Sequence, residues 1–217
     1  EYAGACGGFM DIFGYPFCRG RVFDTLEKDN GQYDTPCKVF WASGACLMVR
    51  RVDFVDYGGF DENFFGQQEE IDLCWRINAR GREVAVVPAS VVYHLGGGTL
   101  SMQDARKTYL NFRNNHFLLY KNLSLGRWML LSFFRFFLDY LAALTFVLRG
   151  KWKDAKAVVK ARIDFLRMKS KVRPLRKKNM EHTICPRIPL VYHGSLLLNY
   201  HFLKKRTFAQ LLPKSKS

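Results

Sequence analysis

The stretch FFGQQEEIDLCWRINARG, residues 64–81, places three carboxylates directly before an apolar pattern. Its apolar and small side chains recur at the i, i+3, i+4, i+7 spacing of one helix face, at Ile71, Cys74, Trp75 and Asn78. Gly81 is a residue type that commonly follows a helix C-terminus. The pattern therefore predicts a helix that begins at the carboxylates, in a chain whose formal net charge is +15.

The carboxylates have two interpretations at this stage. Acidic residues are common in the first turn of a helix, and Asp72 with Arg76 makes an ordinary i, i+4 pair. A carboxylate at the mouth of a helix can also act as a general base. His94, at the end of a predicted strand, also has two interpretations. It could be a buried core histidine or a ligand of a divalent metal.

Composition and charge divide the chain into two parts. The 217 residues are 48% hydrophobic, which is enough for one substantial core. Residues 1–120 carry twelve Lys and Arg against fifteen Asp and Glu, and the remainder carries 22 against four, a net charge of +18. We therefore expect a nearly neutral domain over residues 1–125 and a basic extension over residues 126–217. Six cysteines without a CxxC pair favour reduced side chains and a cytosolic location.

The expected elements mix strands and helices. Residues 38–51 form a β-rich apolar run with a break at Ser43-Gly44, and residues 83–95 suggest two short strands divided at Pro88. Residues 107–123 predict a further helix, and the basic remainder is predicted to be helical up to about residue 170. The fold class expected is α/β, followed by a mainly α-helical basic extension.

Residues 128–149, WMLLSFFRFFLDYLAALTFVLR, are apolar over the length of a bilayer span, but Arg135 and Asp139 interrupt the middle. The segment could span a membrane, lie in its interface or form a core helix. We favour the interfacial helix, because basic residues and tryptophans flank the segment and suit an anionic cytoplasmic leaflet. The same charge would suit nucleic acid, but no recognised nucleic-acid motif is present and we expect no such partner.

Three segments together carry a resemblance to a known family. WASGACLMVRR (41–51), GGFDENFFGQQEEIDLCWR (58–76) and VVYHLGGGT (91–99) occur in the order and spacing of family-2 glycosyltransferases of the GT-A fold. The rhamnosyltransferase-like group of bacterial cell-surface polysaccharide enzymes is the most similar. The resemblance covers about residues 1–125 and extends more loosely into the basic tail. It implies a partial GT-A domain, with the acceptor side in this chain.

The resemblance also implies roles for particular residues. The family's catalytic Asp falls on Glu70, one methylene longer, with Glu69 as a minor candidate and Asp72 as a residue that orients the base. The residues expected to bind substrate are Ser43, Gly44 and Ala45 on the acceptor side, Trp75 and Arg76 beside the base, and Tyr109, Arg113 and Asn114 toward the donor diphosphate. His94 matches the family's late metal-binding histidine, so Mg²⁺ or Mn²⁺ is expected.

The implied activity is inverting transfer from a nucleotide-diphosphate sugar to a hydroxyl of a cell-surface polysaccharide or a lipid-linked acceptor. The family also has a nucleotide-binding half with a DxD-type motif, and no Asp-x-Asp occurs here. Because the chain opens like the interior of a domain, we expect that half to precede it and the chain alone to be inactive. The expected location is peripheral, on the cytoplasmic face of the inner membrane. A non-catalytic basic protein that binds sugar or nucleic acid is the alternative.

Overall fold

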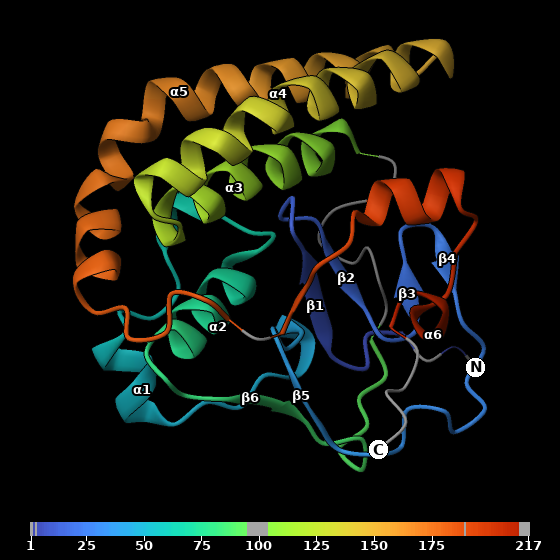
Figure 1. Cartoon of the computed structure of the whole chain (residues 1–217), viewed down its shortest axis with the longest axis vertical. Coiled ribbons are helices and arrows are strands. Elements are labelled where there is room, and N and C mark those ends of the chain that lie inside the picture. Colours follow the sequence, from blue (N-terminus) through green and yellow to red (C-terminus); the bar gives the residue numbers. More distant parts are fainter. Residues whose placement is uncertain (1, 3, 95–103, 189, 213–217) are drawn as a thin grey trace.

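A computed structural model describes residues 2, 4–94, 104–188 and 190–212 (Figure 1). Its main sheet has five strands in the order β4-β3-β2-β1-β7. These strands are β1 (Gly8–Asp11), β2 (Pro16–Cys18), β3 (Arg21–Val22), β4 (Thr25–Leu26) and β7 (Val191–Tyr192). The first four are antiparallel neighbours, whereas β7 runs parallel to β1 with Met10 opposite Val191.

A second, two-stranded sheet pairs β5 (Cys37–Val39) with β6 (Val84–Val86) in antiparallel register. Gly8 connects the two sheets, because its N–H donates to the carbonyl oxygen of Trp41 at 2.8 Å. A Cβ atom at Gly8 would lie 2.0 Å from the Trp41 ring, so only glycine allows this approach. The strand predicted over residues 38–51 is shorter than expected, because β5 ends at Val39. A 3-10 turn at Gly44–Cys46 follows it.

The helix predicted after Gln68 is present as α2 (Glu69–Ala79), and it is preceded by the short helix α1 (Arg51–Asp56) and a 3-10 turn at Glu62–Phe64. Residues 71–79 of α2 are buried. The ring of Trp75 meets that of Phe40 edge to face, with centroids 5.3 Å apart. The second strand predicted within residues 83–95 does not form over residues 91–94, and residues 95–103 lie outside the described part.

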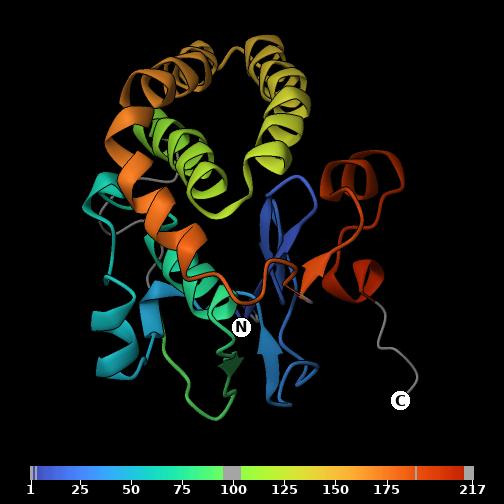
Figure 2. The same cartoon turned by 60° about the vertical axis from the view of Figure 1, so that its left-hand side comes forward.

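Three long helices cover one side of this assembly: α3 (Ala105–Asn122), α4 (Leu125–Leu148) and α5 (Trp152–Glu181). Figure 2 shows α4 and α5 as a hairpin with α3 beneath it. The mixed α/β class with a helical C-terminal part is therefore confirmed. Helix α5 runs eleven residues beyond the predicted end near 170 and contains Pro174. Beyond this proline the last turns of α5 lie against α3, where Asn179 donates to Asn122 Oδ1 at 3.0 Å.

The chain after α5 returns to the main sheet. Strand β7 pairs with β1, and the short helix α6 (Phe208–Leu211) packs the Phe208 ring 5.1 Å from that of Phe9. A five-residue π-helical turn, Leu198–Phe202, lies between them. Residues on both sides of the predicted boundary at 125 share one hydrophobic core. The basic C-terminal region is thus packed into the same core as the preceding residues.

Candidate active site

The start of α2 is held by the polar side chains of α3. The Asn114 side-chain amide donates to the carbonyl oxygens of Phe64, Gly66 and Gln67 at 3.0, 2.7 and 2.8 Å. Arg113 donates to the carbonyl oxygen of Phe64 at 3.0 Å and also to Asn114 Oδ1. These bonds fix the loop that leads into the acidic helix start.

The loop has a backbone that requires such support. Phe65, Gln67 and Gln68 have φ values of 62°, 69° and 71°, which place three non-glycine residues in the left-handed region. Each such residue costs about 1–3 kcal/mol, and clusters of them are found at functional sites. Gln68 is buried, and its side chain bonds the Asn111 carbonyl oxygen and the Asn115 amide at 3.1 and 3.2 Å. The sequence thus adopts a strained turn here that α3 compensates.

Glu70 occupies an unusual environment at the end of this turn. Burial, reinforced by the neighbouring carboxylate of Glu69, raises the pKa of Glu70 from 4.5 to about 7, against the opposing effect of the backbone N–H groups at the helix start. Among the described residues, Oε2 of Glu70 and Oε2 of Glu69 are buried without a hydrogen-bond partner. Buried polar atoms are seldom left unpaired, and an exception calls for a specific reason. A substrate hydroxyl that donates to Glu70 would supply one.

The predicted acceptor segment lies beside this carboxylate. A Cβ atom added at Gly44 would lie 3.8 Å from Cβ and Cγ of Glu70. Gly44 and Ala45 are exposed, and Ser43 is half-buried, with its hydroxyl accepting the N–H of Ala45 at 3.3 Å. The structure therefore brings together Glu70 and the Ser43–Ala45 segment, which are 25 or more positions apart in sequence. The Glu70 side chain therefore packs beside the exposed backbone of Gly44 and Ala45.

Asp72, predicted as a third candidate, is fully buried in a charge network. Its carboxylate bonds the Lys121 ammonium and the Arg76 guanidinium at 2.9 Å each, and it accepts from the Asn122 amide at 2.9 Å. Although burial opposes it, these cations hold the pKa of Asp72 below its usual range. Lys121 also pairs with Asp61, at the start of the preceding turn. Asp72 therefore positions α2 against α3 and has no free carboxylate edge for a reacting group.

Two other predicted residues of α2 also serve its packing. Arg76 donates to the carbonyl oxygens of Tyr57 and Gly59, the latter at 2.7 Å, and is 4% exposed. Trp75 is buried against Phe40. Both side chains lie on the inner side of the helix, away from solvent.

The three residues predicted to reach a donor diphosphate are engaged elsewhere in this structure. Arg113 and Asn114 are buried and bonded to the loop before α2. The Tyr109 hydroxyl donates to Asp164 of α5 at 2.8 Å. Their contact with a donor stays a prediction. In this structure Arg113 and Asn114 hold the backbone of residues 63–67 in place.

His94 is exposed and lies at the edge of the described residues. Among residues 2, 4–94, 104–188 and 190–212, no group of three or more His, Cys, Asp or Glu side chains could hold a metal ion. A single exposed imidazole does not make up the ligand set that Mg²⁺ or Mn²⁺ requires, since these ions prefer several oxygen ligands. The described residues therefore do not fit a metal site, and the metal expected from the family resemblance stays a prediction.

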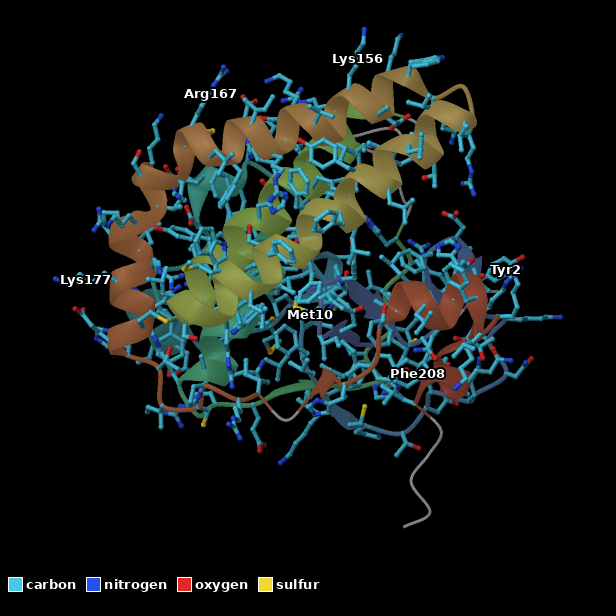
Figure 3. The ribbon with its side chains drawn as sticks, turned by 45° about the horizontal axis from the view of Figure 1, so that its top comes forward. Tyr2, Met10, Lys156, Arg167, Lys177 and Phe208 are labelled. Carbon is cyan, nitrogen blue, oxygen red and sulfur yellow. The ribbon has the colours of Figure 1, made fainter. Side chains whose placement is uncertain are left out.

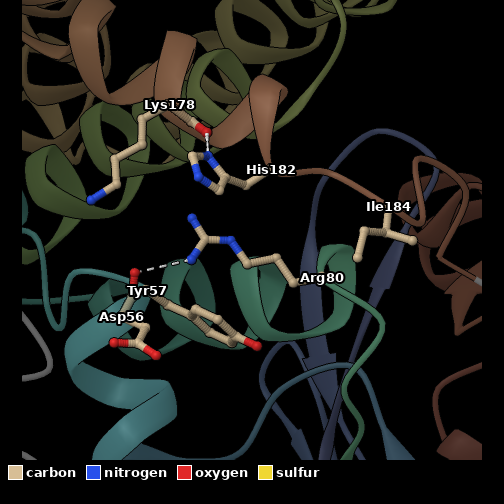
Figure 4. A pocket seen from close by; sticks show the side chains of 6 residues that line it. All are labelled: Asp56, Tyr57, Arg80, Lys178, His182 and Ile184. Atoms are coloured by element: carbon tan, nitrogen blue, oxygen red, sulfur yellow. Dashed lines mark hydrogen bonds between the residues drawn. The ribbon is translucent and has the colours of Figure 1, made fainter.

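A cavity of about 520 Å³ lies at the other end of α2 (Figure 4). Arg80 reaches into it, with its guanidinium 4.4 Å from the centre of the Tyr57 ring, and bonds the Asp56 carbonyl oxygen at 3.3 Å. Across the cavity, the His182 imidazole bonds the Lys178 carbonyl oxygen. Arg80 lies ten positions after Glu70, which corresponds to roughly 15 Å along a helix at 1.5 Å per residue. This cavity is therefore separate from the candidate active site.

Sequence reasoning missed several residues that build the site. These are the buried polar residues Gln68, Asn115 and Lys121, together with the half-buried Asn122. A signal was present, since Asn115, Lys121 and Asn122 interrupt the apolar pattern of the helix predicted over residues 107–123. Polar residues inside such a pattern need partners when buried, and here the partners belong to the start of α2.

Comparison with known proteins identifies the family of the chain. The family model described as glycosyltransferase like family 2 matches residues 2–155, which is more than half of the chain. The chain belongs to this family of glycosyltransferases, as the sequence motifs predict. No solved structure matches it.

Rhamnosyltransferases are among its curated relatives. The N-acetylglucosaminyl-diphospho-decaprenol L-rhamnosyltransferase of Mycobacterium tuberculosis (strain CDC 1551 / Oshkosh) is 35% identical over 88 residues, 41% of this chain and 28% of that protein. Rhamnosyltransferase WbbL of Escherichia coli (strain K12) is 38% identical over 69 residues, 32% of this chain and 25% of that protein. The match thus spans about a quarter of the length of each relative.

Proposed function

We propose that the protein that carries this chain transfers a sugar from a nucleotide-diphosphate sugar to a hydroxyl of a lipid-linked or polysaccharide acceptor, with inversion at the anomeric carbon. The observation that carries the proposal is the Glu70 carboxylate. It lies at a strained helix start beside the exposed Gly44–Ala45 backbone, with one oxygen unpaired and a pKa raised to about 7. A general base works best when its pKa lies near the working pH.

In the proposed reaction, the acceptor hydroxyl donates its proton to Glu70 while its oxygen forms a bond to the anomeric carbon. The bond from that carbon to the donor phosphate breaks on the opposite face, and the nucleoside diphosphate leaves with the bonding electrons. Such general-base assistance contributes about 10²–10⁴-fold to the rate. Asp72 and the α3 side chains serve the step indirectly, because they fix the position of Glu70.

Relatives with rhamnosyltransferase names favour a 6-deoxyhexose such as rhamnose as the transferred sugar. The name of the mycobacterial relative includes a diphospho-decaprenol acceptor, so we propose a polyprenyl-diphosphate glycolipid as the acceptor class. Such an acceptor lies in a membrane. A peripheral position on the cytoplasmic face of the inner membrane suits it, and the net charge of +18 over residues 121–217 agrees with an anionic leaflet.

The test is a transfer assay on the gene product that carries this chain. Nucleotide-linked rhamnose and other nucleotide-sugars are each offered with a polyprenyl-diphosphate glycolipid, and the anomeric configuration of the product is read by NMR. Transfer with inverted configuration would support the proposal. Retained configuration would rule out the single-displacement role of Glu70. Binding of the nucleotide-sugar without turnover would favour the non-catalytic alternative.

A further inference from the structure

Helix α4 presents one continuous apolar side to solvent. Its members are spaced three or four positions apart along the whole helix: Leu130, Phe133, Phe137, Tyr140, Leu144 and Leu148. We name these six residues the α4 outer face. Their exposed fractions range from 37% to 77%. At 1.5 Å per residue, the 24-residue helix is roughly 36 Å long. An exposed apolar surface of this extent marks a contact with another molecule or a membrane.

The charges that interrupt the sequence of α4 lie on its opposite side. Arg135 and Asp139 are 1% exposed and bond each other at 3.0 Å. Arg135 also donates to the Phe13 carbonyl oxygen and to Asn115 of α3. Asp139 faces His116 of α3 at 3.2 Å and Arg162 of α5 at 3.6 Å. These charges therefore belong to the protein interior, and the outer face is free of them.

This arrangement argues against a membrane-spanning position of α4, although its length and composition would permit one. The partners of Arg135 and Asp139 come from the β1–β2 turn, α3 and α5, all of which belong to the same folded body as the sheet. To cross a bilayer, α4 would have to leave these partners and place the ion pair in hydrocarbon, which is costly. The interpretation as a core helix fits no better, because most of the helix is exposed.

Charge favours lipid over a second copy of the chain as the occupant of this face. Arg127 near one end of α4, and Arg149, Lys151 and Lys153 at the other, are exposed. Asp139 is the only acidic residue between positions 105 and 153, and it is buried. Pairing two copies along α4, in either direction, would bring cations against cations. Further cations point outward from α5, including Lys156, Arg167 and Lys177 (Figure 3).

We propose that the α4 outer face docks on an anionic lipid bilayer, with the helix lying along the surface and its apolar side chains in the interface. Trp152, 59% exposed just beyond the helix, belongs to a residue type that favours this depth. Docking in this orientation leaves Arg135 and Asp139 with their partners in the protein. The inference refines the peripheral location in the proposed function, but its test needs no sugar transfer.

The experiment measures binding of the 217-residue chain to vesicles of phosphatidylcholine with phosphatidylglycerol and of phosphatidylcholine alone. The test variant carries Phe133→Asp and Phe137→Asp, and the control carries Val52→Asp and Val55→Asp on α1. These valines are 68% and 63% exposed, so both variants add the same charge at exposed apolar positions. We expect the α4 variant to weaken binding to anionic vesicles at least about tenfold, and the α1 variant to change it less than about twofold. Circular dichroism checks that both fold.

Other outcomes would overturn the inference. Equal loss in both variants would show that charge alone governs binding. Unchanged vesicle binding with loss of a dimer, seen by analytical ultracentrifugation, would assign the face to a second copy. Retention of the bound chain in vesicles after alkaline carbonate extraction would indicate a spanning helix. We expect Glu70→Gln to bind vesicles like the parent chain. Vesicle binding therefore tests the membrane proposal independently of the catalytic role of Glu70.

Discussion

Gly44 lies against Glu70, so that a methyl group added at Gly44 would sit 3.8 Å from the Cβ and Cγ atoms of Glu70. This distance is ordinary van der Waals contact, and Gly44 is exposed. This contact places the predicted acceptor segment, in the 3-10 turn Gly44–Cys46, beside the predicted base in α2. It also means that side chains of increasing size at Gly44 would extend along the Glu70 side chain.

Substitutions at Gly44 should therefore separate folding from access to the site. Gly44→Ala should be well tolerated, because its methyl group meets no atom closer than 3.8 Å. Gly44→Leu should fold equally well but lower transfer by about tenfold or more, since its side chain would occupy the space from which an acceptor approaches Glu70. Thermal unfolding and kcat/KM for the acceptor measure the two effects. Equal kcat/KM for both variants would mean that the acceptor approaches from elsewhere.

The raised pKa of Glu70 predicts a pH-dependent cost in stability. Between 4.5 and about 7 the folded chain holds a proton at Glu70 that the unfolded chain releases, so the free energy of unfolding falls as pH rises through this window. Glu70→Gln removes this dependence. At pH 4, below both pKa values, the two chains should be similar, and at pH 8 the variant should be more stable by up to roughly 3 kcal/mol. Urea unfolding at both values measures this, and a pH-independent difference would contradict a raised pKa.

Removal of the Asp72 carboxylate should affect folding more than chemistry. Asp72→Asn takes away the negative charge that pairs with the buried cations of Lys121 and Arg76. Breaking a buried ion pair from one side costs about 3–5 kcal/mol. Glu62→Gln, at an exposed acidic position in the preceding turn, is the control and should cost less than about 0.5 kcal/mol. If Asp72→Asn unfolds in urea like the parent chain but loses turnover, then Asp72 has a direct catalytic role.

Asn114 offers a test of how the strained loop is maintained. Asn114→Ala removes three hydrogen bonds to the loop and should cost about 2–4 kcal/mol, with faster amide exchange over residues 64–68. Asn111→Ala, on the same helix, is the control, because Gln68 bonds the backbone carbonyl of Asn111 and not its side chain. Unchanged exchange in Asn114→Ala, together with weaker donor binding, would instead support the predicted contact with the diphosphate.

The geometry around His94 predicts weak metal binding by this chain. An exposed imidazole without neighbouring ligands among the described residues should not bind Mn²⁺ in a saturable manner at micromolar concentration. Titration calorimetry of the 217-residue chain and of His94→Ala should therefore give the same result. Stoichiometric Mn²⁺ binding that is lost in His94→Ala would show that His94 is a ligand.

The sequence was informative where patterns are local. The spacing of Ile71, Cys74 and Trp75 with Gly81 predicted α2 closely, and the ordered motifs predicted the family. Local patterns could not show that Lys121 would meet Asp72, 49 positions away, or that Asn114 would hold residues 64–67. Such partners depend on how α3 packs against α2, and a polar residue in a helical pattern does not by itself indicate its partner.

The limits were similar in the basic half. Arg135 and Asp139 were correctly predicted to share a helix, but only the tertiary structure shows that both face inward. The periodicity of the sequence could not decide which way they face, because this helix carries apolar residues on every side. The C-terminal strand β7 was missed because two residues, Val191 and Tyr192, are too short a pattern to stand out.

The most direct test of the account is Glu70→Gln in the gene product that carries this chain, with Glu69→Gln as the matched control. The amide keeps the size of the side chain and its reach but cannot take the acceptor proton. We expect Glu70→Gln to lower kcat by about 10²-fold or more while the Kd for the donor stays near that of the parent enzyme. Glu69→Gln should have a much smaller effect. Full activity of Glu70→Gln with loss of activity in Glu69→Gln would move the base by one position. Full activity of both would show that the carboxylates only begin a helix.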